Sequence, residues 1–357
     1  MKRRIGLLTS GGDCPGLNAV IRGVAKAAYE NIEEVEIIGI HGGFYGLING
    51  EYKEMDKQDF SGILTIGGTI LGTSRQPYSK MKVIEEDTDK VANMKANYKN
   101  MDLDCLMILG GNGTHKTANL LEQEGLNVIA LPKTIDNDIW GTDVTFGFHT
   151  AVDIATEVVD RIHTTASSHG RVMVIEIMGN KVGWLTLYAG IAGGADVILL
   201  PEMPFEIESV IKAVERRAAK GSDFSIICVA EGAMTVDEAK YKRRERDEQR
   251  IEKGYLGICD MIARQIQDRA NIETRTVVPG HIQRGGSPSA YDRLLSTRFG
   301  MYASYLVKNE CYGVTVAMLN GTVMHNALSA VAGKTKFVPT DHQILQVAKG
   351  IGISFGI

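Results

Sequence analysis

The segment 131–138, LPKTIDND, places an amine, a hydroxyl and two carboxylates within residues 133–138, directly after an apolar run. The run 126–131 predicts a strand, so Lys133 to Asp138 would lie at its carboxyl end, where open α/β sheets bind ligands. Asp136 and Asp138 are two apart and would face the same side of an extended loop. There they could serve as a base and a magnesium ligand, which suits phosphoryl transfer. The structural alternative is a polar turn whose Asp and Asn side chains only bond to nearby backbone groups.

Two further segments repeat the order strand, glycine-rich loop, helix. The run 5–10 precedes GGDCPG (11–16) and a helical pattern over 17–29, and the run 105–109 precedes GGNGT (110–114) and a helical pattern over 115–121. Glycines let backbone N–H groups approach a phosphate closely, and a helix N-terminus adds its positive dipole end. A single glycine turn is more often explained by packing, but three such units at one sheet edge indicate phosphate binding.

The bulk composition is that of an ordinary globular protein. The chain has 357 residues, 44% hydrophobic and 23% charged, with a net charge of -4. We expect room for two lobes and no general affinity for nucleic acid. The five cysteines show no metal-ligand spacing, so we expect them to be reduced and largely buried. The sequence shows no signal-peptide pattern and no apolar run of membrane-spanning length, and we expect a cytoplasmic protein without a membrane partner.

Apolar runs alternate with helical patterns through most of the chain, which predicts an α/β protein with mainly parallel sheets flanked by helices. A helix is expected to begin at 148–150 and to bridge two lobes. The charged stretch 240–248 is interpreted as a solvated helix, with nucleic-acid or membrane binding as the alternative. The expected strands are 5–8, 36–40, 105–109, 128–131, 172–177, 197–200 and 226–230.

Six motifs, spread in order over almost the whole chain, resemble those of the 6-phosphofructokinase family, and no Walker-type P-loop is present. They are TSGGDCPGLNAVIRG, GTSRQP, GGNGTHKTA, PKTIDND, MGNKVGWLTLYAGIAGGAD and PGHIQRGGSPSAYDR. The resemblance implies two α/β lobes with the active site in the cleft between them. It implies a donor (ATP) lobe of residues 1–147 plus 283–333 and a fructose 6-phosphate lobe of residues 148–282 plus 334–357.

The resemblance also implies roles for individual residues. Asp136 would be the base that accepts the proton of the sugar 1-hydroxyl, while Thr134 would hold the transferred group. Arg75 would bridge the phosphates of both substrates, and Gly11 would present its backbone N–H to the donor. The implied donor-binding set is Gly11, Gly12, Arg75, Gly111, Asn112, Gly113, Thr114 and Lys133, with Mg²⁺ at Asn112 and Asp138. The implied sugar-phosphate set is Thr134, Asp136, Asp138, Arg171, Met178, Gly179, Glu231, Arg275, His281 and Arg284.

Three positions depart from the pattern that the resemblance implies. Asn112 stands where the family usually has an acid, which removes a formal charge next to the expected magnesium position. Asn180 replaces an arginine of allosteric bacterial members. Lys133 replaces a glycine, and a lysine there is typical of pyrophosphate-dependent members, although several ATP-dependent branches carry it too.

ATP is the expected donor, because Gly113 leaves open the space that an aspartate fills in pyrophosphate-dependent members. The expected activity is therefore glycolytic ATP-dependent 6-phosphofructokinase, and pyrophosphate-dependent transfer is the alternative. An NAD or lipid kinase with a similar glycine loop, and a sugar-phosphate-binding regulator without catalysis, are weaker alternatives.

The resemblance implies self-association as a homotetramer, or a homodimer, with active sites shared between subunits. Arg171 and Arg275 would reach the 6-phosphate in a neighbouring chain. We expect little response to phosphoenolpyruvate, because His163 and Ser222 stand where an arginine and a lysine are expected in the effector site. The remaining effector residues, Arg22, Lys26, Asp196 and Lys220, roughly preserve the family's set.

Overall fold

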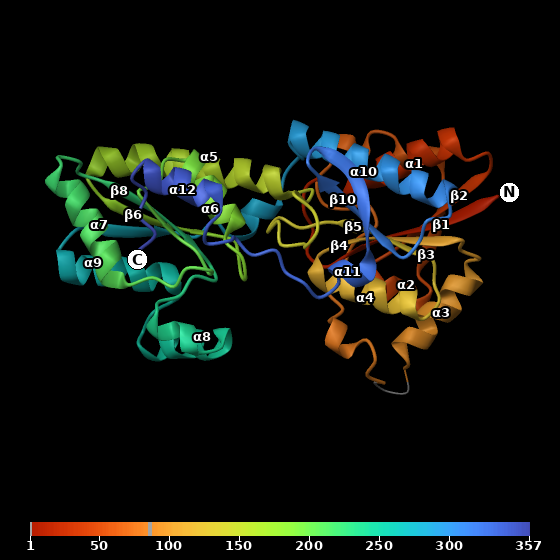
Figure 1. Cartoon of the computed structure of the whole chain (residues 1–357), viewed down its shortest axis with the longest axis horizontal. Coiled ribbons are helices and arrows are strands. Elements are labelled where there is room, and N and C mark those ends of the chain that lie inside the picture. Colours follow the sequence, from red (N-terminus) through yellow and green to blue (C-terminus); the bar gives the residue numbers. More distant parts are fainter. Residues whose placement is uncertain (1, 85–87) are drawn as a thin grey trace. The chain divides into compact units, whose positions relative to one another are not determined.

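The computed structural model describes residues 2–84 and 88–357, and the chain folds into two compact units (Figure 1). Unit 1 comprises the chain up to Thr150 together with Arg284–Lys336, and unit 2 comprises Ala151–Gln283 and Phe337–Ile357. The lobe boundaries expected from the sequence lie one to three residues from these divisions. The first division falls inside the long helix α5 (Phe148–His169), which begins where a bridging helix was expected.

Unit 1 is built on a seven-stranded sheet of order β11-β10-β5-β4-β1-β2-β3. The five central strands are parallel, and the edge strands β3 and β11 are antiparallel to their neighbours. The strands are β1 (Arg3–Ser10), β2 (Val35–Ile40), β3 (Tyr52–Met55), β4 (Cys105–Gly110), β5 (Val128–Pro132), β10 (Val314–Leu319) and β11 (Thr322–Ala327).

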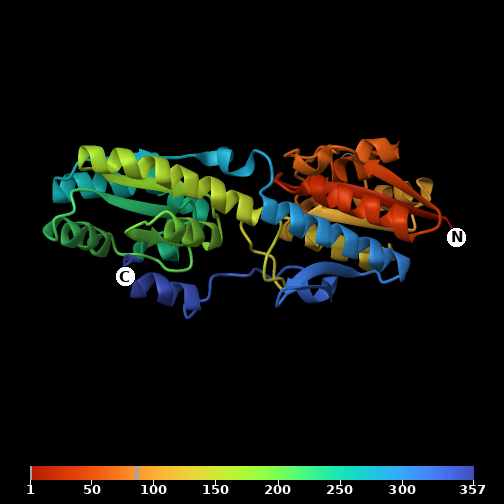
Figure 2. The same cartoon turned by 90° about the horizontal axis from the view of Figure 1, so that it is seen from above.

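Helices cover both faces of this sheet, as the alternation of strand and helix patterns predicts. Helices α1 and α10 lie side by side on one face (Figures 1 and 2). Gly23 and Gly300 allow that close approach, because a Cβ at Gly300 would lie 2.5 Å from the Val20 carbonyl oxygen. The helices of the unit are α1 (Leu17–Asn31), α2 (Phe44–Asn49), α3 (Lys90–Asn100), α4 (Asn112–Gln123), α10 (Ala290–Lys308) and α11 (Leu328–Val331), with short 3₁₀ turns at 57–60, 63–65 and 78–80.

Unit 2 has a four-stranded, fully parallel sheet of order β7-β8-β6-β9. Its core joins Val172 and Val174 of one strand to Val210 and Ile262 of two covering helices. The strands are β6 (Val172–Ile177), β7 (Val197–Leu199), β8 (Ser225–Ala230) and β9 (Thr274–Val277). The helices are the rest of α5, α6 (Trp184–Ala192), α7 (Ile207–Ala219), α8 (Arg243–Glu252), α9 (Ile258–Ala270) and α12 (Gln343–Gly350), with 3₁₀ turns η4 (Asp237–Lys240) and η5 (Gly280–Arg284).

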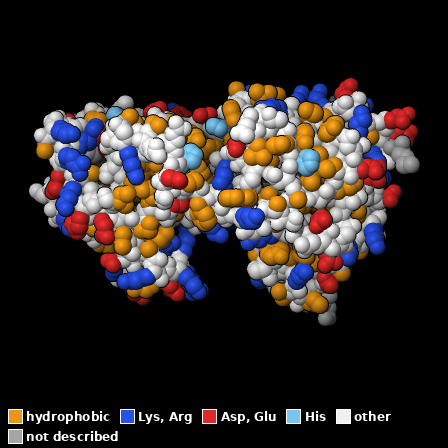
Figure 3. All heavy atoms as spheres, viewed as in Figure 1, with side chains coloured by type: hydrophobic (Ala, Val, Ile, Leu, Met, Phe, Trp, Pro, Cys, Tyr) orange, Lys and Arg blue, Asp and Glu red, His pale blue; other side chains and the backbone are white. Residues whose placement is uncertain are grey.

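The charged stretch does form a helix, α8, and most of its residues are exposed, as expected for a solvated helix, but one face of the helix is not solvated. Figure 3 shows Lys and Arg side chains gathered over it, yet Arg246 and Arg250 are buried. Arg250 forms a bidentate ion pair with Glu238, with both distances 2.7 Å. Guanidinium groups can be buried where a carboxylate pairs with them, so α8 packs through a polar face that hydrophobic periodicity cannot detect.

The cysteines are as expected from the sequence. All five cysteines are free thiols, and four of them are buried, Cys311 being the partly exposed one. Burial raises the pKa of the Cys14 thiol to about 12. Among the helices of the described residues, none has the length and apolar character needed to cross a membrane.

Candidate active site

Three loops of unit 1 begin at the same level of one sheet edge. Strands β1, β4 and β5 are adjacent and parallel, and their last residues Ser10, Gly110 and Pro132 are paired in register. The glycine loop after β1, the GGNGT loop after β4 and the TIDND loop after β5 therefore leave the sheet side by side. This is the convergence that the sequence predicts for a phosphate-binding edge.

Lys133 joins these three loops. Its backbone N–H donates to the Gly110 carbonyl (3.1 Å), and its side-chain ammonium donates to the Gly12 carbonyl. The side chain is 4% exposed, and burial lowers the pKa of its amine. A Cβ placed on Gly11 would lie 3.7 Å from the Lys133 Nζ, in ordinary van der Waals contact with the ammonium. Lys133 thus connects its own loop to the other two loops through hydrogen bonds.

In the TIDND loop, half-exposed and buried residues alternate. Thr134, Asp136 and Asp138 are half-exposed, while Ile135 and Asn137 between them are buried. The hydroxyl of Thr134 accepts a hydrogen bond from the Asp136 backbone N–H (3.0 Å). One hydroxyl and two carboxylates therefore share the accessible side of the loop.

The loop after β1 is held by residues 73 and 74. The N–H of Gly11, expected to face donor phosphates, donates instead to the Ser74 carbonyl (3.1 Å), and its carbonyl accepts from the Thr73 hydroxyl (2.7 Å). The left-handed backbone at Gly11 (φ 84°) turns this N–H toward the neighbouring segment. The same segment carries Arg75, whose side chain is exposed.

The GGNGT loop forms the first turn of α4. Its positive dipole end adds to the phosphate-binding character of this edge. Gly113 is exposed, and a Cβ built there would meet nothing within 4 Å. Thr114 is buried.

His115, one residue further along α4, is buried and anchors the turn. Its Nδ1 lies 3.0 Å from the Gly111 carbonyl oxygen, and its Nε2 lies 2.9 Å from the Thr315 hydroxyl. A carbonyl only accepts, so Nδ1 carries the proton. Burial lowers the imidazole pKa to about 4, so His115 is neutral at physiological pH.

Arg284, expected among the sugar-phosphate residues, lies beside the donor loop of unit 1. Its Nη1 donates to the Asp13 carbonyl (3.3 Å), and a Cβ on Gly12 would lie 2.7 Å from that nitrogen. A side chain at position 12 would therefore require the Arg284 guanidinium to move from this position.

In unit 2, the backbone of Met178 and Gly179 follows β6, and Glu231 follows β8. These are adjacent parallel strands, so the three residues meet at one carboxyl edge. The buried Gln283, to which the sequence assigned no role, accepts from the Met178 N–H (3.1 Å) and donates to the Gly280 carbonyl (3.2 Å). It fixes the turn that carries the exposed His281.

Arg171 and Arg275 occupy the opposite edge of the same sheet. Arg171 directly precedes β6, Arg275 pairs in register with Met173, and both guanidinium groups bind Glu273, at 3.0 and 2.5 Å. About six residues of extended strand, or ~20 Å, separate this edge from Met178. The structure therefore divides the expected sugar-phosphate residues of unit 2 into two groups.

The two residues expected to hold magnesium, Asn112 and Asp138, differ in their chemistry as ligands. Mg²⁺ is commonly held by one or two carboxylates together with substrate phosphates, and of the two expected ligands the half-exposed Asp138 fits that requirement. Asn112 uses its amide nitrogen as a donor to Lys334 and Thr335. Among residues 2–84 and 88–357, no cluster of three or more His, Cys, Asp or Glu side chains has the arrangement of a metal site.

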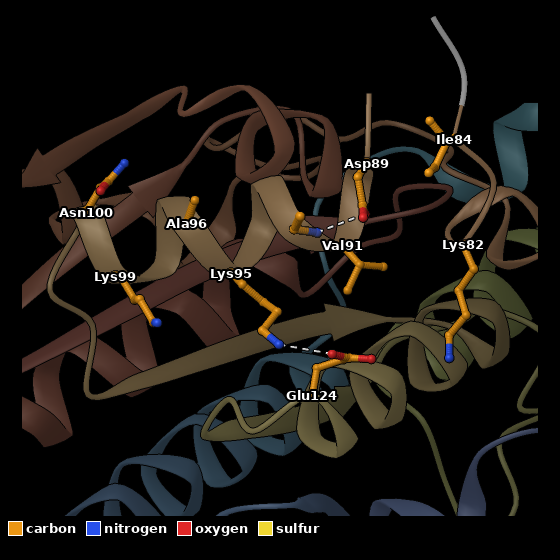
Figure 4. A pocket seen from close by; sticks show the side chains of 10 residues that line it. Lys82, Ile84, Asp89, Val91, Lys95, Ala96, Lys99, Asn100 and Glu124 are labelled. Atoms are coloured by element: carbon orange, nitrogen blue, oxygen red, sulfur yellow. Dashed lines mark hydrogen bonds and ion pairs between the residues drawn. The ribbon is translucent and has the colours of Figure 1, made fainter. Parts of the chain in front are cut away.

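A separate pocket of about 730 Å³ lies along α3 (Figure 4). Lys95 and Glu124 form an ion pair across it (3.0 Å), and Asp89 caps the N-terminus of α3. None of its lining residues belongs to the expected donor or sugar-phosphate sets. The loops described above, and not this pocket, therefore form the candidate active site.

Parallel strands that end together in glycine loops, a helix N-terminus and paired carboxylates define an α/β protein with a phosphate site. A family model described as Phosphofructokinase matches residues 4–307. Two relatives agree over nearly their whole length. The chain is 53% identical to "ATP-dependent 6-phosphofructokinase" of Spirochaeta thermophila, covering 99% of this chain and 98% of that protein. It is 47% identical to "ATP-dependent 6-phosphofructokinase 3" of Bacteroides thetaiotaomicron, covering 99% and 100%. The chain belongs to the phosphofructokinase family.

Solved structures show the same fold. A Pichia pastoris phosphofructokinase in the T-state matches with a TM-score of 0.78 and 30% identity, over 98% of this chain and 36% of that chain. A pyrophosphate-dependent phosphofructokinase of Marinobacter aquaeolei matches with a TM-score of 0.80 over 99% of this chain and 92% of that chain, at 19% identity, which supports the fold alone.

Proposed function

We propose that the protein is an ATP-dependent 6-phosphofructokinase of the glycolytic type, which acts in the cytoplasm. It transfers the γ-phosphoryl group of ATP to the 1-hydroxyl of fructose 6-phosphate and forms fructose 1,6-bisphosphate. The observation that carries this proposal is the convergence of three phosphate-type loops at Lys133. The names of the full-length relatives support the reaction and the donor.

Positioning and charge neutralisation do most of the work in this chemistry. Asp136 accepts the proton of the 1-hydroxyl as that oxygen attacks, since its carboxylate stands on the accessible side of the loop. The Thr134 hydroxyl, already on that side, holds the transferred group. Arg75 is exposed beside the Gly11 loop, where its planar guanidinium binds phosphate oxygens bidentately. Mg²⁺, when bound at Asp138, supplies further neutralisation of the donor phosphates.

The open space at Gly113 favours ATP over pyrophosphate as the donor. A Cβ there meets nothing within 4 Å, so the first turn of α4 leaves room for a larger donor. Lys133 was the argument for pyrophosphate, but its ammonium is buried and donates to the Gly12 carbonyl. A lysine used in this way is compatible with either donor.

In unit 2 the arginines expected to bind the 6-phosphate lie far from the residues expected to contact the sugar. This separation supports active sites shared between subunits, in a homotetramer or a homodimer. Met178, Gly179 and Glu231 contact the sugar, whereas Arg171 and Arg275 lie at the other edge of the sheet, ~20 Å away along the strand. Two arginines that share a single carboxylate keep spare positive charge for a phosphate dianion. We propose that each chain lends these arginines to a neighbour.

A coupled assay that offers ATP and pyrophosphate separately with fructose 6-phosphate tests the function. We expect fructose 1,6-bisphosphate with ATP and at least 10-fold lower kcat/KM with pyrophosphate. A preference for pyrophosphate would identify the alternative enzyme, and no turnover with either donor would identify a binding protein.

A further inference from the structure

Asn112 contacts a segment that is distant from it in the sequence. Its Nδ2 donates two hydrogen bonds, to the Lys334 carbonyl (2.8 Å) and to the Thr335 hydroxyl (3.1 Å). An aspartate, the residue that the family resemblance implies here, has no donor when ionised. Its carboxylate would face the Lys334 carbonyl oxygen without a proton between them. The Asn112 amide therefore supplies the donors that the acceptors of segment 334–336 require, and a carboxylate would not.

Segment 334–336 in turn holds the TIDND loop. Thr335 forms an antiparallel bridge with Ile139, and the Lys336 backbone N–H donates to the Asp138 carbonyl (2.8 Å). The Lys336 ammonium donates to three oxygens: Asn137 Oδ1 (3.0 Å), the Thr142 carbonyl (2.8 Å) and the Asp143 carbonyl (2.9 Å). The Lys336 side chain therefore links both ends of the turn 137–143 through hydrogen bonds.

Asn137, which accepts a hydrogen bond from the Lys336 ammonium, has an uncommon backbone conformation. Asn137 is buried and left-handed (φ 53°), and its Oδ1 also accepts from the Thr145 N–H (3.1 Å). A left-handed residue other than glycine is uncommon and persists where its surroundings fix it. Because Asn137 lies between Asp136 and Asp138, its conformation sets the directions of both carboxylates.

We propose that Asn112 is a positioning residue and not a magnesium ligand: its amide docks segment 334–336, and that segment, through Lys336, fixes the TIDND loop relative to the first turn of α4. The donor loop and the catalytic loop are then connected by hydrogen bonds outside the reacting groups. The role assigned to the TIDND carboxylates rests on the proposed function, but the connection itself does not.

The test compares Asn112→Asp with the native protein by hydrogen–deuterium exchange without substrate or metal. Loss of one net hydrogen bond of ~1 kcal/mol corresponds to about 5-fold faster exchange. We expect that acceleration in peptides covering 134–143 and 334–340. Thr335→Val, which removes one acceptor only, should give a smaller increase in the same peptides. Gly113→Asp is the matched control, because it adds a carboxylate one residue away and keeps the amide, so exchange in those peptides should not change.

Activity supplies the second readout. If Asn112 were a weakened magnesium ligand, Asn112→Asp would lower the Mg²⁺ concentration needed for half-maximal rate and leave exchange unaltered. That result would overturn the proposal. We expect instead a kcat reduced by about 5-fold or more, no lower Mg²⁺ requirement, and the same exchange pattern in Lys336→Met. If the native protein did not phosphorylate fructose 6-phosphate, the proposed function would fail while the exchange experiment still decided the connection.

Discussion

Replacing Gly113 by aspartate tests why the donor is ATP. The position lies in the first turn of α4, is exposed, and has no atom within 4 Å of a built Cβ. The backbone at Gly113 does not have a positive φ, so a residue with a side chain fits it without strain. Aspartate has a slightly higher helix propensity than glycine, and an acid in the first turn adds ~0.3–1 kcal/mol. The variant should therefore fold at least as stably as the native protein.

The effect on ATP should be large, because the added carboxylate would stand beside the donor phosphates. Two like charges ~5 Å apart at an effective dielectric constant of ~20 repel by about 3 kcal/mol, which is roughly 100-fold in kcat/KM. Gly113→Asn has nearly the same shape without the charge and separates the steric part from the electrostatic part. The assay is steady-state kinetics with ATP, with thermal melting as the check on folding. If Gly113→Asp melts normally and uses ATP as well as the native enzyme, the argument from open space is wrong.

Three further predictions follow from single sites. His115 has a pKa of about 4 in the folded protein, below the usual 6.5, so the unfolded state binds the imidazole proton more tightly. The contribution of neutral His115 to the free energy of unfolding is complete above pH 6.5. It is lost as the pH falls toward 4, by on the order of 3 kcal/mol. Urea unfolding from pH 7 to 5 should show about 2 kcal/mol of this loss, and His115→Gln should flatten it; equal slopes in both proteins would contradict the assignment. Phosphoenolpyruvate should inhibit little, because His163 and Ser222 stand where an arginine and a lysine are expected in the effector site; sigmoidal inhibition at physiological concentration would contradict this. Mixed Arg171→Ala and Asp136→Ala proteins should regain part of the native activity after subunit exchange, and no recovery despite proven exchange would count against shared sites.

The sequence predicted most of the strands whose hydrophobic pattern is strong. All seven expected strands occur, with ends that differ by a few residues, and the helix expected from residue 148 is present. The expected strands left out β3 and β11, which are largely exposed edge strands, and β9, which has an arginine in its four residues. They also left out β10, although its sequence VTVAML is apolar and almost wholly buried. Helix α8 was expected, but the burial of Arg250 was not, because an ion pair to Glu238 gives no periodic signal.

The loops of the site were predictable in kind but not in their connections. The sequence placed Thr134 and Asp136 after a strand, and the structure adds that Lys133 joins that loop to Gly12. It did not suggest Lys336 or Gln283, since hydrogen bonds between residues far apart in sequence leave no local pattern. For Gln283, its place inside the glycine-rich motif PGHIQRGG was the one signal that the sequence offered.

The most direct test of the account is the kcat of Asp136→Asn with saturating ATP and Mg²⁺. Asparagine keeps the shape of the side chain and the backbone bond to Thr134, but it cannot accept the proton of the 1-hydroxyl. We expect a kcat lower by ~10²–10⁴, typical of losing a positioned base, with little change in the KM for fructose 6-phosphate. A folded Asp136→Asn enzyme with near-normal kcat would contradict it.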